Sequence, residues 1–193
     1  MFYIKTRIMA VFYRISAMTW YRFFLGKMGR HSVFVWPIRI HNPKSVEIHE
    51  DVMIDSGGWL YGVDNTNSKL IIRSGAQIGR LFHCVAYNSV EIQENVLIAE
   101  RVFISDCNHE FRNIDKPILS QGLYPLSNVV IGQGTWIGEN VSVVGAKIGR
   151  NCVIGANSVV THDVDDYCVV AGNPAKVIKK YNSKTDLWEK VNE

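Results

Sequence analysis

The chain has 193 residues, of which 47% are hydrophobic and 20% charged, a composition that excludes a disordered or fibrous protein and suits one globular domain. The net charge of +3 is too small to indicate nucleic-acid binding, so no nucleic-acid partner is expected. Four cysteines without a CxxC pair argue against a disulfide scaffold and favour reduced thiols in the cytoplasm.

The first 32 residues are predicted to form an amphipathic helical segment. Residues 1–30 contain six basic residues and no acidic residue, together with eight of the 21 aromatic residues of the chain. Because charge interrupts each apolar stretch, we expect neither a signal peptide nor a membrane-spanning helix. We expect this segment to cap the end of the structure that follows. Peripheral contact of residues 1–30 with anionic lipid at the inner face of the membrane is the alternative.

From about residue 33 to residue 172, aliphatic residues recur at intervals of six. This period fits neither an α-helix nor a strand of alternating polarity, but it fits a coil of short strands separated by turns. The fifth residue of each unit is small or β-branched, and the second is often glycine, to which we assign the turn conformation. The 18-residue interval between Ile54 and Ile72 is interpreted as three units. We predict that the aliphatic residues stack as a core, with Cys152 as a small core residue. The aliphatic positions are Ile48, Ile54, Ile72, Ile78, Ile92, Ile98, Ile104, Ile131, Ile137, Val143, Ile148, Ile154 and Val160.

These units resemble the hexapeptide repeat of the left-handed parallel β-helix, which is found in the hexapeptide-repeat acyltransferases. The resemblance implies an all-β solenoid over residues 33–172, with three units in each triangular coil and helical additions at both ends. It also implies a homotrimer whose sites lie at the boundaries between subunits.

The repeat is interrupted between Ile104 and Ile131, because no whole number of units fills the interval of 27 residues. The interval contains two prolines and residues of mixed polarity, and it is predicted to be a loop extruded from the coil at about residues 107–128. Long loops on a rigid scaffold often carry function, so the interruption is where we expect the active site.

His109 lies at the start of this loop, in the segment "ISDCNHEF" at residues 104–111. The segment resembles the element that carries the catalytic histidine in the sugar acetyltransferases of the family. We therefore predict that His109 is a general base, which deprotonates a sugar hydroxyl as it attacks the thioester of acetyl-CoA. The proton would then pass to the departing thiolate.

Several polar residues near His109 are candidates for supporting roles. Asp106, Asn108 and Glu110 could orient the ring or bind the acceptor, or they could be solvated residues of a loop. His83 lies in a second irregular interval and could line the acceptor pocket or cap a turn. A covalent mechanism through the Cys107 thiolate is the weaker alternative.

The C-terminal stretch "AGNPAKVIKK" at residues 171–180 resembles the family's chain exit, after which residues 173–193 are expected to form a helical tail. The resemblance places CoA along the last coils, between neighbouring subunits. Trp136 would lie near the thioester, and Ala156 and Thr161 would offer backbone contacts to the pantetheine arm. Lys176 and Lys179 would approach the nucleotide phosphates.

The sequence thus predicts a cytoplasmic O-acetyltransferase that uses acetyl-CoA as co-substrate, requires no metal, and acts on a surface polysaccharide or its precursor. N-acetylation of an amino sugar is the first alternative. A zinc-dependent β-helix of the carbonic anhydrase type is the second; it would need three converging ligands, for which His83, His109 and His162 are the central candidates. A catalytically silent scaffold is the third, and the presence of His109 argues against it.

Overall fold

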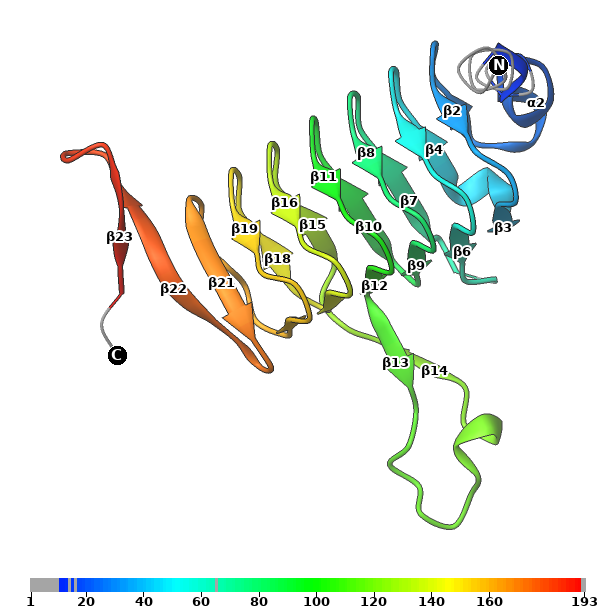
Figure 1. Ribbon diagram of the computed structural model, residues 1–193. Helices are drawn as coiled ribbons and strands as arrows, with labels where there is room; N and C mark the ends of the chain where they lie inside the picture. Colours follow the sequence, from blue (N-terminus) through cyan, green and yellow to red (C-terminus); the bar gives the residue numbers. More distant parts are fainter. Residues whose placement is uncertain (1–10, 14, 16, 65, 192–193) are drawn as a thin grey trace.

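The computed structural model describes residues 11–13, 15, 17–64 and 66–191, and Figure 1 shows their arrangement. Short strands stack along one axis in three parallel sheets, and successive strands of the chain belong to successive sheets. Three six-residue units therefore complete one coil, and the predicted left-handed parallel β-helix is confirmed. Among the described residues, no helix is long and apolar enough to cross a bilayer.

The three sheets differ in what they carry at their ends. The three sheets form the faces of a triangular prism, and its corners are the turns between strands. Sheet A contains only short parallel strands, and sheet B ends in an antiparallel hairpin. A second hairpin leaves the prism from sheet C. Sheet A consists of β1 (Lys27–Met28), β4 (Val46–Ile48), β7 (Lys69–Ile72), β10 (Ser89–Ile92), β15 (Val129–Ile131) and β18 (Lys147–Ile148). Sheet B consists of β2 (Val33–Phe34), β5 (Met53–Ile54), β8 (Gln77–Ile78), β11 (Leu97–Ile98), β16 (Trp136–Ile137), β19 (Val153–Ile154), β21 (Cys168–Gly172), β22 (Ala175–Asn182) and β23 (Leu187–Lys190). Sheet C consists of β3 (Arg39–His41), β6 (Trp59–Gly62), β9 (His83–Ala86), β12 (Phe103–Ser105), β17 (Ser142–Val144) and β20 (Val159–Val160).

The predicted aliphatic residues form the core, since each pairs in register with its equivalent in the next coil. All are at most 2% exposed. The residues at the fifth position of the units are equally buried; they are Val52, Ala76, Val96, Val102, Thr135, Val141, Cys152 and Ser158. The sheet A column is Ile48, Ile72, Ile92, Ile131 and Ile148. The sheet B column is Ile54, Ile78, Ile98, Ile137 and Ile154. The sheet C column is Leu60, Cys84, Ile104, Val143 and Val160.

Two details of the repeat differ from the prediction. The interval from Ile54 to Ile72 is not three units: Leu60 fills the sheet C column, and the six surplus residues form a longer corner before β7. The glycines at the second position do not supply the turn. A Cβ on Gly132 would lie 2.4 Å from the backbone of the next coil, so glycine is needed for close approach. The left-handed turn conformation is adopted by residues such as Asn95 (φ 56°).

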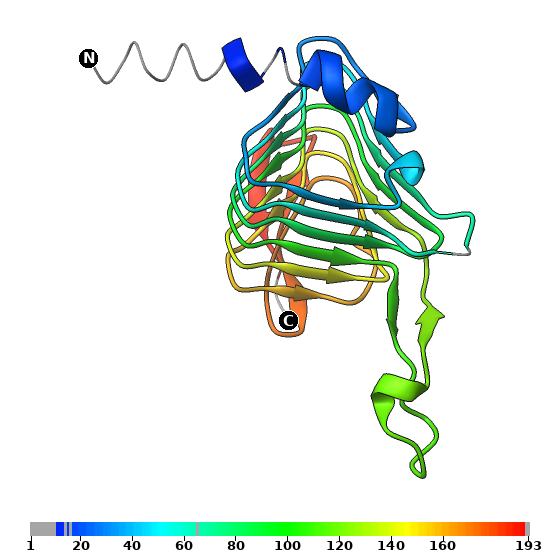
Figure 2. The ribbon, with the colours of Figure 1, turned by 90° about the vertical axis from the view of Figure 1, so that its right-hand side faces the viewer.

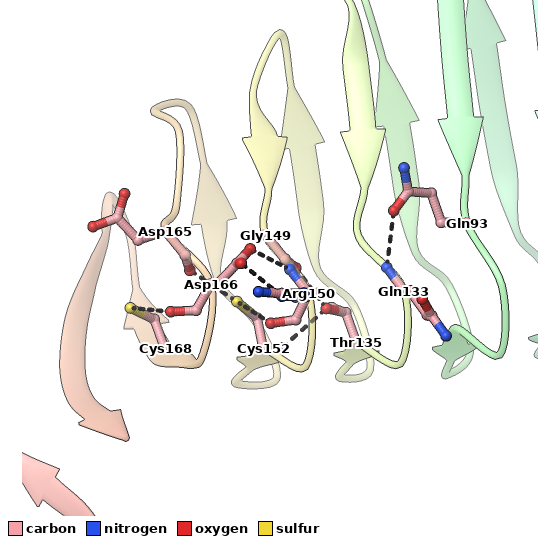
Figure 3. A network of polar contacts seen from close by, with 9 residues as sticks. All are labelled: Gln93, Gln133, Thr135, Gly149, Arg150, Cys152, Asp165, Asp166 and Cys168. Carbon is pink, nitrogen blue, oxygen red and sulfur yellow. Dashed lines mark hydrogen bonds and ion pairs between the residues drawn. The ribbon is translucent and has the colours of Figure 1, made fainter. Parts of the chain in front are cut away.

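Polar groups at one corner join the later coils (Figure 3). The Thr135 hydroxyl donates to the Gly149 carbonyl at 2.8 Å and accepts the Cys152 N–H at 3.0 Å. One coil further on, Asp166 accepts both the backbone N–H and the Nε–H of Arg150, at 2.9 and 2.8 Å. Burial raises the pKa of the Cys152 thiol, so this cysteine remains a protonated core residue, as predicted.

The N-terminal helical segment lies across the first coil (Figure 2). It comprises a π-helical turn, η1 (Ala17–Tyr21), and a short helix, α2 (Arg22–Phe24). The ring of Tyr21 packs edge-on against Phe34 with centroids 4.8 Å apart, and Leu25 is buried in the core. The parallel strands begin at Lys27, since β1 pairs with β4. The predicted membrane contact falls partly on residues 1–10, which lie outside the described residues.

The predicted C-terminal helix over residues 173–193 is wrong. Strand β21 pairs antiparallel with β22, which pairs antiparallel with β23. The last parallel strand would otherwise expose a row of unpaired backbone groups, and the hairpin satisfies them. The six-residue period ends here, but β-branched residues such as Val177 and Ile178 still favour a strand.

The core columns allow a direct test of packing on two neighbouring residues of β11. Replacement Ile98→Ala removes a buried side chain and is expected to lower the free energy of unfolding by about 2–5 kcal/mol. Leu97→Ala, at a side chain that is 50% exposed, is the matched control and should change it by less than about 1 kcal/mol. Urea titration followed by circular dichroism measures both, and equal losses would contradict the assignment of inward and outward faces.

Candidate functional site

The predicted extruded loop is a long β-hairpin that leaves the prism at the end of β12 (Figure 1). Strands β13 (Cys107–His109) and β14 (Leu123–Pro125) pair antiparallel, with His109 opposite Leu123. A 3-10 turn, η3 (Ile118–Ser120), lies near the tip. The base of the hairpin is held by the Leu126 N–H, which donates to the Asp106 carbonyl at 2.7 Å.

Asp106 is fully buried and holds two parts of the scaffold together. Its carboxylate accepts the backbone N–H groups of Tyr87, Asn88 and Ser89, at 2.5, 2.7 and 2.7 Å. Tyr87 and Asn88 form the corner between β9 and β10, where the surplus residues of the irregular interval lie, and Ser89 begins β10. Asp106 therefore fixes the corner and the foot of the hairpin, while both of its oxygens are directed away from the solvent.

His109 is exposed on the hairpin, just beyond the point where the chain leaves β12. In the described part of the chain, no side-chain hydrogen bond or ion pair occupies its imidazole, so both ring nitrogens are available to a ligand. Asn108 is also exposed, opposite Tyr124 of β14. The ring is thus held on a paired strand with its polar atoms free, as a general base requires.

Glu110 is directed into its own hairpin. Its carboxylate accepts the backbone N–H groups of Phe111 and Arg112, both at 3.0 Å, and forms an ion pair with the Arg112 guanidinium. These bonds to Arg112 lower the pKa of Glu110 to about 2, so the carboxylate is ionised at neutral pH. The guanidinium in turn lies over the Tyr124 ring. Glu110 is therefore placed to brace the hairpin.

Cys107 is buried at the base of the same hairpin. Its backbone N–H donates to the Ser105 hydroxyl at 3.1 Å, and that hydroxyl donates to the Cys107 carbonyl at 2.8 Å. Burial raises the pKa of the thiol, which keeps the nucleophilic thiolate scarce at neutral pH. The geometry therefore disfavours the covalent alternative.

His83 lies on the outer face of sheet C, in a strip of aromatic rings. Trp59 stacks on it at 4.5 Å with an interplanar angle of 4°, and Phe103 tilts against it at 5.2 Å. The three residues are register partners in β6, β9 and β12. Burial lowers the pKa of His83, so its imidazole is neutral at pH 7. His83 therefore lies beside Phe103 at the start of β12, whereas His109 follows the end of β12 on β13.

The sequence reasoning did not single out Trp59 or Phe103. The signal was available, because each immediately precedes a residue of the sheet C core column, as His83 does. Side chains alternate between faces in a strand, so all three had to share the outer face.

The residues predicted to bind the cofactor fall on different parts of the prism. Trp136 lies on the outer face of sheet B, in register with Val153, which pairs with Val169; Lys179 lies opposite Val169. Lys176 lies on the same strand, β22, three residues before Lys179. Ala156 is exposed at the corner from sheet B to sheet C.

Thr161 is separated from that group, because it follows β20 at the corner from sheet C back to sheet A. This is the corner at which the hairpin with His109 leaves the prism, two coils earlier in the stack. A single chain therefore places Trp136 on the face of sheet B and His109 at the corner between sheets C and A.

The three histidines considered for zinc are also apart: His83 is on the face of sheet C, His109 on the hairpin, and His162 beyond β20. Over residues 11–13, 15, 17–64 and 66–191, no group of three or more potential ligands is arranged to hold a metal ion.

Comparison with known proteins gives one family model and several relatives. The model described as the hexapeptide repeat of succinyl-transferase matches residues 128–162. A candidate lipopolysaccharide biosynthesis O-acetyl transferase, WbbJ of Escherichia coli K12, is 44% identical over 130 residues, which cover 63% of this chain and 66% of that protein. The alignments span 66%, 48% and 60% of the first three curated relatives, which is less than two thirds of the length of each.

Two solved structures are similar along most of the chain. A maltose O-acetyltransferase from Clostridium difficile 630 is 28% identical with a TM-score of 0.56, and the match covers 84% of this chain and 73% of that one. AntD, an N-acyltransferase from Bacillus cereus solved with dTDP and 3-hydroxybutyryl-CoA, has a TM-score of 0.71 over 85% of this chain and 87% of its own. At 20% identity, the second match is a likeness of fold.

The role of Asp106 can be tested by Asp106→Asn, which replaces one acceptor oxygen by an NH₂ group that must face backbone N–H donors. We expect a loss of about 1.5–3 kcal/mol in the free energy of unfolding, because bonds to a buried charge are lost. Asp115→Asn, the same change at an exposed residue of the hairpin tip, should have little effect. Thermal melts of both variants, with proteolysis of the hairpin as a second measurement, make the comparison; unchanged stability of Asp106→Asn would contradict the role.

Proposed function

We propose that this chain acts as the hexapeptide-repeat acetyltransferases that it resembles do, and that it transfers an acetyl group from acetyl-CoA to a hydroxyl group of a saccharide. The observation that carries the proposal is the exposed, unoccupied imidazole of His109 at the foot of the extruded hairpin. The names of the relatives, an O-acetyl transferase of lipopolysaccharide biosynthesis and a maltose O-acetyltransferase, support a saccharide as the acceptor class.

In the proposed reaction, an imidazole nitrogen of His109 takes the proton of the acceptor hydroxyl as its oxygen attacks the thioester carbon. The tetrahedral intermediate collapses with cleavage of the carbon–sulfur bond. The imidazolium then returns the proton to the CoA thiolate, which leaves an acetyl ester and free CoA. The hairpin contributes by holding the ring on a paired strand whose foot is fixed by Asp106.

The aromatic strip supports the proposed place of the acceptor on the outer face of sheet C. Rings such as Trp59 and Phe103 can stack against the apolar face of a sugar, while the neutral His83 imidazole can donate or accept one hydrogen bond. A surface polysaccharide or its precursor fits the name of the WbbJ relative. Asn108 is proposed as an acceptor contact because it is exposed beside His109.

The active unit is proposed to be a homotrimer with each site built across two subunits. In one chain Trp136 lies on the face of sheet B and His109 at the corner between sheets C and A, so a neighbouring chain would supply one of them if both contact the same acetyl-CoA. Trp136, Ala156, Lys176 and Lys179 would then bind the cofactor from one side, and Thr161 from the other. The reaction is proposed to take place in the cytoplasm, where the four free cysteines stay reduced.

The catalytic role of His109 is tested by His109→Ala. We expect the acetyl-transfer rate to fall by about 10²- to 10⁴-fold, while acetyl-CoA binding measured by calorimetry is unchanged. His31→Asn, at an exposed histidine on the first coil, is the control and should keep full activity. Hydroxylamine cleaves an ester but spares an amide, so its action on the product separates O- from N-acetylation. Full activity of His109→Ala would contradict the mechanism.

The shared site is tested by mixing two inactive variants, His109→Ala and Trp136→Ala, and allowing their trimers to exchange. A site that takes one residue from each neighbour is then intact at about one boundary in four, so about a quarter of wild-type activity should return. Each variant treated alone is the control. A mixture that forms mixed trimers without regaining activity would place both residues in one chain's site.

A further inference from the structure

The N-terminal helical segment has an inner face that packs on the first coil and an outer face that is apolar. Tyr21 and Leu25 are on the inner side. Away from these contacts, Phe23 is 76% exposed, and Phe12, among the described residues before η1, is 66% exposed. A terminal cap needs only its inner face to be apolar, and solubility favours a polar outer face. We call the exposed set the N-terminal apolar face; it consists of Val11, Phe12, Ile15, Trp20, Phe23 and Phe24.

The N-terminal apolar face continues onto the first coil. Trp36 is 63% exposed, and its indole N–H donates to the Tyr21 hydroxyl at 2.8 Å, which attaches the corner after β2 to the helix. Between the helix and the coil lies a hollow of about 260 Å³ lined by Trp20, Phe24 and Ile38, with four further residues. Two tryptophans therefore frame an apolar surface at one end of the prism.

The segment that carries this surface is basic in sequence, and described basic side chains lie beside the surface. Residues 1–30 carry a net charge of +6, since they contain six basic and no acidic residues. Arg22, Lys27 and Arg30 are exposed around a small hollow that also includes Glu50. Lys44 adds a further charge, and its ammonium donates to the Phe23 carbonyl at 3.1 Å.

We propose that this end of the molecule binds peripherally to a bilayer that contains anionic lipid, with the N-terminal apolar face in the interfacial region. Apolar and aromatic side chains flanked by Lys and Arg are the composition that such interfacial segments use. Anionic headgroups complement the net charge of +6, whereas a second copy of the same surface would be repelled by it.

The proposed trimer would strengthen this binding. Threefold symmetry places the three N-terminal segments at the same height along the symmetry axis, so all three can contact one membrane. The lipid contact does not depend on the reaction, but it would bring the enzyme to acceptors carried on membrane lipids.

The test is flotation of the full-length protein with vesicles of phosphatidylcholine alone or with about 30% phosphatidylglycerol. We expect binding to the anionic vesicles that weakens as salt is raised. Replacement of Phe12 and Phe23 together by Glu should weaken it by about tenfold or more, while replacement of both by Leu should retain it. No binding to anionic vesicles at low salt, or equal binding by the Glu variant, would overturn the proposal.

The matched control replaces two exposed apolar residues at the opposite end of the stack, Leu187 and Val191, by Glu, and should float like the wild type. Thermal melts show whether each variant is folded, and acetyl-CoA binding shows that its site is intact. The competing explanation is that a second copy of the chain covers this surface, and light scattering tests it. If the wild type binds no vesicles and its assembly loses mass when Phe12 and Phe23 are replaced by Glu, the surface is an interface between copies. Loss of transfer activity alone would bear on the proposed function and not on the lipid contact.

Discussion

The interaction on which the molecule depends is the stacking of each inward aliphatic side chain on its equivalent in the next coil. A single coil cannot bury its own apolar edge, so stability accumulates only along the stack, and every strand must keep its register. Surplus residues are therefore expelled at the corners, where they leave the columns undisturbed. The corner at residues 87–88 and the hairpin after β12 are two such insertions, and both belong to the candidate site.

The same constraint explains what the sequence could reveal. The six-residue period predicted the core columns of sheets A and B because isoleucine fills them almost without exception. It missed Leu60 and Cys84 in sheet C, where the residue type changes but the position does not. The C-terminal tail carries no period, and the need of the last strand of sheet B for a partner is a property of the assembled sheet. The role of Asp106 was likewise hidden, because its partners lie 17 to 19 residues away along the chain.

Within the candidate site, Asp106 has a positioning role and His109 has the proposed catalytic role. The Asp106 carboxylate is buried and bound to three backbone N–H groups, so it holds the foot of the hairpin and does not face a substrate. His109, three residues on, is exposed with its ring nitrogens free. The arrangement separates a rigid support from a reactive group, which is what a site built on an inserted loop needs if its geometry is to be reproducible.

The two ends of the stack are covered by different elements with different surface compositions, a hairpin at the C-terminal end and a helical segment at the N-terminal end. At the C-terminal end, the β22–β23 hairpin exposes apolar side chains such as Leu187 among charges of both signs, as in the 3.1 Å pair of Lys180 with Asp165. Such a mixed surface satisfies the exposed sheet edge and remains compatible with water. At the N-terminal end, Leu25 is buried and Tyr21 packs on Phe34, which is enough to cover the first coil, yet Phe12 and Phe23 are exposed in a basic segment. Capping requires only the inner contacts, so it does not explain the exposed apolar residues. The proposed contact with an anionic bilayer does explain them.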